Sequence, residues 1–230
     1  MVHFTLFGIP VYIRPSFWVV LAIFGGALSI SSVEDLIYPA LFVIAGFVAI
    51  LSHEMGHALV GHKLGGGQQT IVLELFGGLT SSHGMQLTRG GRALMILAGP
   101  MMTLLLGIIS LWLTWNIVAP VMTSYNLNFW DLAISPFTAA LISPKLYILS
   151  CLIMIGEWWT ILNLLPIYPL DGGQLIAQYI RSPRKVFMTG FITAILIGLL
   201  SFQLFHGYFI PIFMALFAYS NYREYKNAPF

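Results

Sequence analysis

Long apolar stretches recur along the whole chain and are separated by short polar segments. A hydrocarbon core of about 30 Å needs about 20 helical residues to cross it, and six stretches reach or approach that length. The pattern therefore predicts an all-α integral membrane fold with about six transmembrane helices. We expect these spans, to within several residues, at 16–31, 37–60, 93–117, 146–168, 186–206 and 208–222.

Two segments depart from this simple pattern. Residues 71–79, after the second predicted span, read IVLELFGGL, which is apolar but too short and glycine-broken to cross. We expect a short re-entrant or strand-like segment there, next to a cavity, because irregular backbone is tolerated at membrane depth only inside protein or beside water. Pro166 and Pro169 interrupt the fourth span, so we expect a broken fourth helix.

Composition supports a membrane protein. Of 230 residues, 58% are hydrophobic and 8% are charged, against about a quarter charged in soluble domains. A net charge of +2 is too small to indicate a nucleic-acid partner. Since no polar or low-complexity linker divides the sequence, we expect a single membrane domain over residues 1–230.

The basic residues indicate an orientation in the bilayer. If six helices cross and the N-terminus is cytoplasmic, nine of the ten Lys and Arg residues lie on the cytoplasmic side, which is the usual asymmetry of membrane proteins. We therefore expect a multi-pass protein with both termini in the cytoplasm, in the cell membrane if the source is prokaryotic. The nine are Arg14, Lys63, Arg89, Arg92, Arg181, Arg184, Lys185, Arg223 and Lys226, and the exception is Lys145.

Candidate chemistry begins near the end of the second span, where residues 53–57 read HEMGH. On a helix, His53 and His57 lie one above the other and can bind one metal ion, with Glu54 beside them. Ionisable residues inside a span are costly and are functional by default. The motif predicts a metal site of the kind that hydrolyses peptide bonds.

A catalytic zinc needs a third protein ligand. His62 lies out of register with the known longer zinc motif. Glu74 and Asp171 remain as candidates, and depth favours Asp171. His53 lies about ten residues, or roughly 15 Å of helix, before Lys63, and Asp171 lies about ten residues before Arg181, and both basic residues are expected in the cytoplasm.

Together, HEMGH and the later NLLPIYPLDGG at 163–173 resemble the site-2 protease family of intramembrane zinc metalloproteases. The resemblance implies one zinc per chain, held by His53, His57 and Asp171, with Glu54 as the catalytic residue. It implies a transmembrane segment of another protein as substrate, often already trimmed by an upstream protease. Gln174 stands where members usually have a basic residue, and we expect no appended PDZ or CBS domain to recruit substrates.

Several roles and rival functions stay open at this stage. The amide of Asn163 could stabilise the helix break or contact the scissile peptide or its oxyanion. Glu157, within the fourth span, is expected to face the interior. A metal transporter would not need Glu54 and would need further ligand clusters along a path. A catalytically inactive homologue that binds client proteins would not need every catalytic residue, yet all are present.

Overall fold

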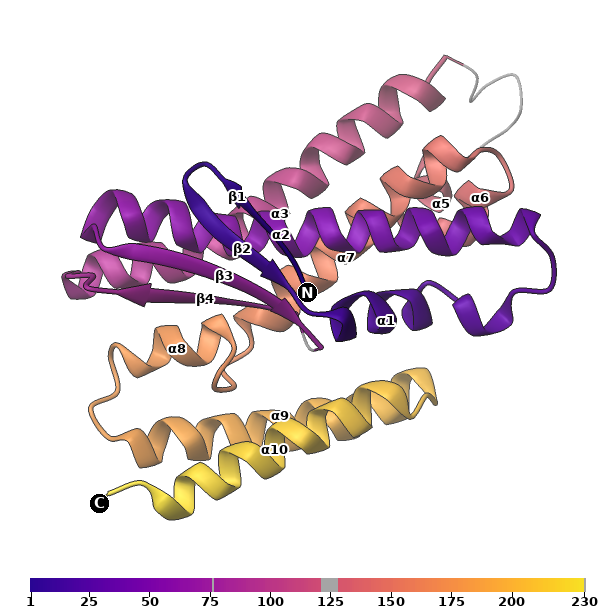
Figure 1. The fold of residues 1–230 in the computed structure, drawn as a ribbon. Coiled ribbons are helices and arrows are strands. Elements are labelled where there is room, and N and C mark those ends of the chain that lie inside the picture. The colour runs from indigo at the N-terminus through magenta and orange to yellow at the C-terminus, as the bar shows by residue number, and fades with distance from the viewer. Residues whose placement is uncertain (76, 121–127, 230) are drawn as a thin grey trace. The chain divides into compact units, whose positions relative to one another are not determined.

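The computed structural model describes residues 1–75, 77–120 and 128–229, and it is mainly helical with one four-stranded sheet (Figure 1). The chain divides into two compact units, Met1–Thr160 and Ile161–Phe230, which are described in turn. The single domain expected from the sequence stays a prediction. The elements are β1 (Val2–Leu6), β2 (Ile9–Ile13), α1 (Pro15–Phe24), η1 (Ala27–Ser29), η2 (Glu34–Leu36), α2 (Ile37–Gly65), β3 (Gln68–Glu74), β4 (Gly77–His83), α3 (Arg89–Val118), α5 (Phe129–Ile134), α6 (Pro136–Ala140), α7 (Pro144–Leu164), α8 (Asp171–Ala177), α9 (Pro183–Phe205) and α10 (Phe209–Asn227).

Among the described residues, four helices are long and apolar enough to cross a membrane, namely α2, α3, α7 and most of α9. They coincide with the second to fifth predicted spans. The first predicted span, 16–31, overlaps α1, a helix of only ten residues, which ends where Gly25 and Gly26 follow. Gly26 has a φ of 87°, a conformation that does not continue a helix.

The sheet has the order β1-β2-β3-β4. Strands β1 and β2 form an antiparallel hairpin whose turn residues, Phe7 and Gly8, both have positive φ, as tight hairpin turns require. Strand β2 pairs in parallel with β3, and β3 pairs antiparallel with β4. The strand-like segment predicted at 71–79 is therefore confirmed as parts of β3 and β4, although Phe76 lies outside the described residues. The sequence did not predict β1 and β2.

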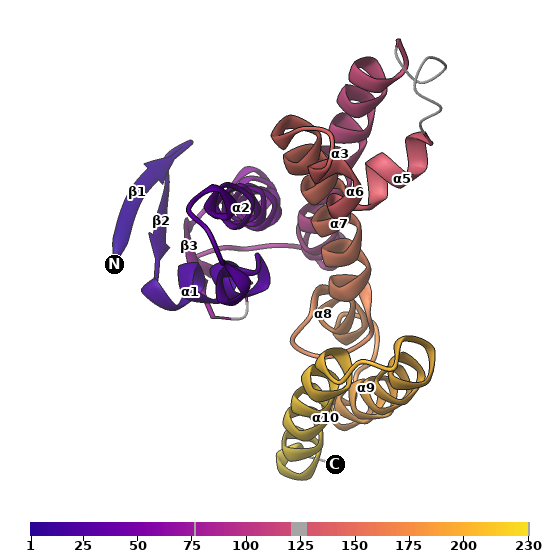
Figure 2. The same ribbon diagram turned by 90° about the vertical axis from the view of Figure 1, so that its right-hand side faces the viewer.

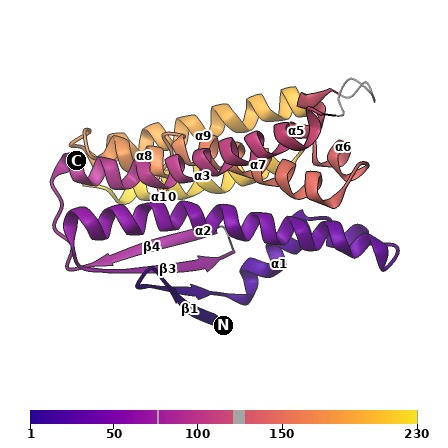
Figure 3. The same cartoon turned by 90° about the horizontal axis from the view of Figure 1, so that it is seen from above.

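One face of the sheet packs against helices α1 and α2 (Figure 2). Alternate residues of the strands, including Val11, Ile71 and Leu73, are fully buried and pack with Phe17 of α1 and Met55 of α2. Helix α2 lies between the sheet and α3 (Figure 3). The predicted metal motif therefore lies on a helix that is covered from two sides.

The first unit also contains α5, α6 and most of α7. With both termini in the cytoplasm, the six predicted spans put residues 118–145 on the opposite side of the membrane, and residues 121–127 of this segment lie outside the described residues. The described remainder contains α5 and α6, each begun by a side-chain cap from Asn128 or Ser135. Leu132 and Ala133 of α5 and Ala139 of α6 are buried, so these short helices pack against the rest of the unit.

The second unit contains the end of α7, then α8, α9 and α10. Helices α9 and α10 form a hairpin, and Ala194, Met214 and Ala218 pack around Ile167. Residues 165–170 separate α7 from α8, so the broken fourth helix predicted from the two prolines is confirmed.

Candidate metal centre

The HEMGH residues lie inside the continuous helix α2, three turns before its end. His53, Glu54 and His57 are 2%, 5% and 8% exposed. The Nε2 atoms of the two histidines face each other at 3.1 Å. The helix thus brings two buried imidazoles to one point, as the sequence predicted.

This pair fits a zinc ion. Zinc binds histidine nitrogens at about 2.0–2.1 Å in tetrahedral geometry, which places two such nitrogens about 3.4 Å apart. The observed 3.1 Å between His53 Nε2 and His57 Nε2 is close to that separation. On the other side of its ring, Nδ1–H of His57 donates to the carbonyl of Met95, at 2.8 Å. A carbonyl only accepts, so the hydrogen sits on Nδ1, and Nε2 carries the lone pair that a metal would use.

Helix α3 packs closely against the two histidines of α2 because glycines lie where the two helices meet. A Cβ atom placed on Gly99 would lie 2.2 Å from Nε2 of His57 and 2.9 Å from Nε2 of His53. One placed on Gly56 would lie 2.4 Å from the carbonyl oxygen of Ala98. Small residues let membrane helices approach at the backbone. Here they also leave the space beside both donor nitrogens.

Strand β4 and the end of α7 complete the surroundings in the first unit. The Oγ1 hydroxyl of Thr80 donates to Oε2 of Glu54 at 2.7 Å. Trp159 stacks edge-on against His53, with ring centroids 6.5 Å apart. The sequence reasoning assigned no role to Thr80 or Gly99, because their contacts join segments that are far apart in the chain.

Glu74 and His62, the other residues considered as a third ligand, lie elsewhere in the first unit. Oε2 of Glu74 forms an ion pair with Arg14 at 3.0 Å, on the strand face opposite to the buried one that packs on α2. The Nδ1 atom of His62 lies 3.2 Å from the carbonyl oxygen of Gly67, on an exposed part of α2. Neither observation supports a role as the third ligand.

In the second unit, Asp171 is the first residue of α8 and is buried at 6% exposure. The break before it is held by amide side chains. Gln174 Nε2 donates to the carbonyl of Pro169 at 2.8 Å, and Asn221 Nδ2 donates to the carbonyl of Tyr168 at 2.6 Å. These bonds satisfy carbonyls that the break removes from helical pairing. Gln174, noted only as a departure from the family pattern, thus has a structural partner.

Asn163 and Glu157 are two further polar residues of α7 that lie in the predicted fourth span. Asn163, near the end of the helix, is buried at 9% exposure. Glu157 is exposed, so the expectation that it faces the interior was wrong. The reason is helical periodicity: the neighbouring Gly156 faces α3, with an added Cβ 3.0 Å from the carbonyl oxygen of Thr103, and the next residue points about 100° away.

A helical protein whose described residues include four membrane-crossing candidates, and which has a buried His-Glu-x-x-His helix that fits zinc, belongs to the class of membrane metalloproteins. The sequence matches the profile of Peptidase family M50 over residues 41–205. The chain belongs to this family and is an integral membrane protein.

Individual relatives agree with the family assignment. A zinc metalloprotease from Methanocaldococcus jannaschii is 29% identical over 227 residues, which cover 94% of this chain and 57% of the relative. A relative from Synechocystis is 28% identical over 188 residues, covering 76% of this chain and 43% of its own length. The chain thus spans about half the length of these curated relatives. Both relatives are named zinc metalloproteases, the second as a putative one.

The fold agrees as well. The solved structure of a site-2 protease from Methanocaldococcus jannaschii matches with a TM-score of 0.61 at 24% identity, over 97% of this chain and 94% of that one. The resemblance to the site-2 protease family stated from the two motifs is confirmed.

Proposed function

We propose that the protein is an intramembrane zinc endopeptidase that cleaves peptide bonds within or near the transmembrane segments of other membrane proteins. The observation that carries this proposal is the buried histidine pair, whose Nε2 atoms are 3.1 Å apart, with Glu54 next to His53 on the same helix. A pair of metal-binding histidines and an adjacent carboxylate are parts that zinc hydrolysis needs.

The proposed ligand set is His53, His57 and Asp171, holding one zinc per chain. Each offers one ligand atom, and all three are buried. Glu74, the alternative carboxylate, is half-exposed and paired with Arg14. A buried carboxylate is costly and is found paired, hydrogen-bonded or on a metal, whereas the carboxylate of Glu74 already has Arg14 as its partner near the surface. This difference favours Asp171.

The protein's own residues would then divide the reaction. When bound, zinc supplies Lewis-acid chemistry that lowers the pKa of water to about 7 and polarises a carbonyl. Glu54 accepts a proton from the attacking water and delivers it to the leaving amine. The amide of Asn163 is proposed either to donate to the carbonyl oxygen that becomes negative or to stabilise the break at the end of α7.

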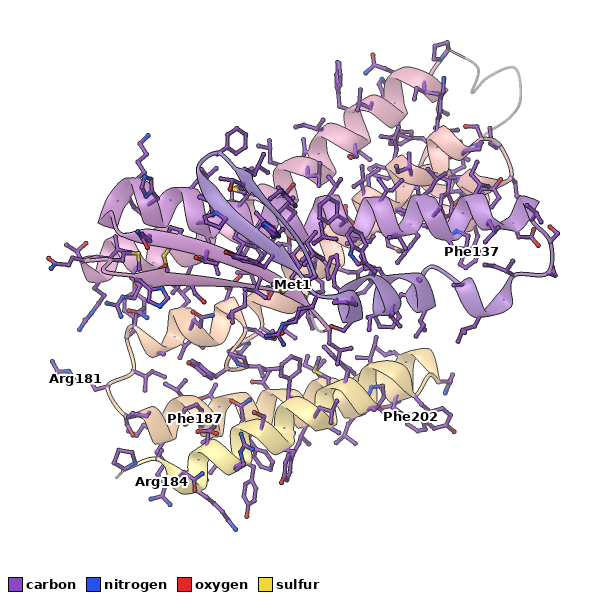
Figure 4. All side chains as sticks on the ribbon, in the orientation of Figure 1. Met1, Phe137, Arg181, Arg184, Phe187 and Phe202 are labelled. Atoms are coloured by element: carbon purple, nitrogen blue, oxygen red, sulfur yellow. The ribbon has the colours of Figure 1, made fainter. Side chains whose placement is uncertain are left out.

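The proposed orientation places both termini and residues 61–92 in the cytoplasm. Its support is the distribution of basic residues, of which Arg181 and Arg184 lie near the start of α9 (Figure 4). A Gln86→Cys variant in a Cys151→Ser background tests it. An impermeant thiol reagent should fail to label residue 86 in sealed cells and should label it after lysis. Labelling of intact cells would reverse the orientation.

Proteolysis by purified protein tests the proposed function. The substrate is a tagged protein with one transmembrane segment, such as an upstream protease leaves behind, and mass spectrometry maps the products. We expect cleavage in or near that segment, its loss with a zinc chelator and its return with added zinc. Metal flux into liposomes without proteolysis would identify a transporter instead. Capture of intact substrate without product would identify an inactive homologue, and either result overturns the proposal.

A further inference from the structure

The side chain of Glu54 is held by a residue of the sheet. The hydroxyl of Thr80, on β4, donates to Oε2 of Glu54 at 2.7 Å, and its oxygen also lies 3.2 Å from the main-chain carbonyl oxygen of Glu54. A hydroxyl carries a single proton, and a bond to a carboxylate is shorter and stronger than one to a neutral carbonyl. The shorter contact to Oε2 is therefore the main hydrogen bond.

Gly78 lies on the same face of β4, two residues before Thr80, because side chains alternate along a strand. A Cβ atom placed on Gly78 would lie 2.1 Å from Cγ and 2.6 Å from Oε1 of Glu54. The two residues thus lie against different parts of the Glu54 side chain. Thr80 engages Oε2, and the missing side chain of Gly78 leaves room for Oε1.

We infer that Thr80 is a positioning residue for the proteolytic reaction: its hydroxyl fixes Oε2 of Glu54 so that Oε1 receives the proton of water. This inference rests on the proposed role of Glu54 as general base. A glutamate side chain has three rotatable bonds, and a general base works only within hydrogen-bond reach of the proton it takes. Thr80 removes that rotational freedom.

The hydrogen bond can persist through the reaction. When Oε1 of Glu54 takes a proton, Oε2 remains an acceptor for the Thr80 hydroxyl, and no proton passes to or from Thr80. When Oε1 gives its proton to the leaving amine, the carboxylate returns to its starting state. Thr80 therefore orients the base in both halves of the cycle without taking part in proton transfer.

A purely structural role would also explain a hydrogen bond between a strand and a helix, so the test must separate the two. Three variants serve: Thr80→Val, which keeps the shape and removes the hydroxyl; Thr80→Ser, which keeps the hydroxyl; and Ser81→Val, a matched control on the opposite face of β4. For each, zinc content, thermal unfolding, kcat and KM are measured on the same transmembrane substrate. Glu54→Gln and the double variant Glu54→Gln/Thr80→Val complete the set.

We expect Thr80→Val to lower kcat by about 10- to 100-fold, the range of a hydrogen bond to a charged group, with KM and zinc content unchanged. Thr80→Ser and Ser81→Val should retain most of the activity. The double variant should be no less active than Glu54→Gln alone, because Thr80 acts through that carboxylate. Normal kcat in Thr80→Val, or loss of zinc and fold instead, overturns the inference. If Glu54→Gln itself stays active, the proposed function fails first, and the two failures are distinguishable.

Discussion

The two regions that carry the predicted zinc ligands accommodate buried polar groups in different ways. In α2, the backbone stays helical through the HEMGH motif, and neighbouring segments make room by lacking side chains at Gly78 and Gly99. At the α7–α8 junction, the backbone itself breaks, and amide side chains of Gln174 and Asn221 satisfy the carbonyls that the break exposes.

This difference predicts which substitutions should damage each region. The α2 region needs glycines beside its polar side chains, so adding a methyl group at such a glycine should displace a ligand. The α7–α8 junction depends on donors that are present, so removing an amide should loosen it. The α2 region is therefore tested by adding a methyl group, and the α7–α8 junction by removing an amide.

The largest effect is expected at the junction itself. Asp171→Ala removes a proposed zinc ligand, whereas Glu74→Ala removes only a surface ion pair. Loss of an outer-shell partner alone costs about 10- to 100-fold in metal affinity, so loss of Asp171 should cost at least about 100-fold. Zinc content of the purified variants checks this. If Glu74→Ala loses zinc and Asp171→Ala retains it, the ligand assignment is reversed.

A smaller but still large effect is expected from adding a methyl group beside the histidines. In Gly99→Ala, the new Cβ would lie 2.2 Å from Nε2 of His57, so the imidazole or α3 must move. We expect weaker zinc binding and a loss of about 1–3 kcal/mol of stability from overpacking. Zinc titration and thermal unfolding measure both.

Gly107, two turns further along α3, provides the matched control. A Cβ placed there meets no heavy atom within 4 Å. Gly107→Ala should leave zinc binding unchanged and should stabilise the helix slightly, by about 0.5–1 kcal/mol. Equal zinc affinity in Gly99→Ala and Gly107→Ala would show that the close approach of α3 does not shape the site.

The smallest effect is expected from deleting an amide that supports the break. Asn221 is 1% exposed and its Nδ2 bonds to the Tyr168 carbonyl, so Asn221→Ala leaves that carbonyl unpaired at about 1–3 kcal/mol. Asn116→Ala is the control, because the Asn116 amide is exposed and donates to the carbonyl of Trp112 in its own helix. Thermal unfolding of both variants compares them, and equal midpoints would contradict the proposed support.

The sequence predicted most of what depends on local pattern. Four spans, the strand-like segment near residue 71, the helix break after Leu164 and the convergence of His53 and His57 follow from hydropathy, proline positions and helical spacing. What it missed depends on contacts between distant segments. Nothing near Thr80 or Gly99 indicates that each lies beside the motif on α2, and the β1–β2 hairpin is recognised only once β3 pairs with it.

The first predicted span shows that hydropathy also fails to predict where a helix ends. Residues 16–31 are apolar enough for a membrane helix, but Gly25 and the left-handed Gly26 end α1 after ten residues. Glycine is tolerated inside membrane helices as well as at their ends, so hydropathy alone does not decide between the two. The backbone conformation at Gly26 decides it.

The central claim is that Glu54 acts as the base of a zinc-dependent proteolysis, and Glu54→Gln tests it most directly. The substitution keeps the size of the side chain and removes the carboxylate that accepts the proton. On a single preparation, zinc content and cleavage of a transmembrane substrate are measured together. We predict about one zinc per chain and a rate at least about 100-fold lower, with substrate still bound. Cleavage near the wild-type rate, or loss of zinc together with activity, would contradict it.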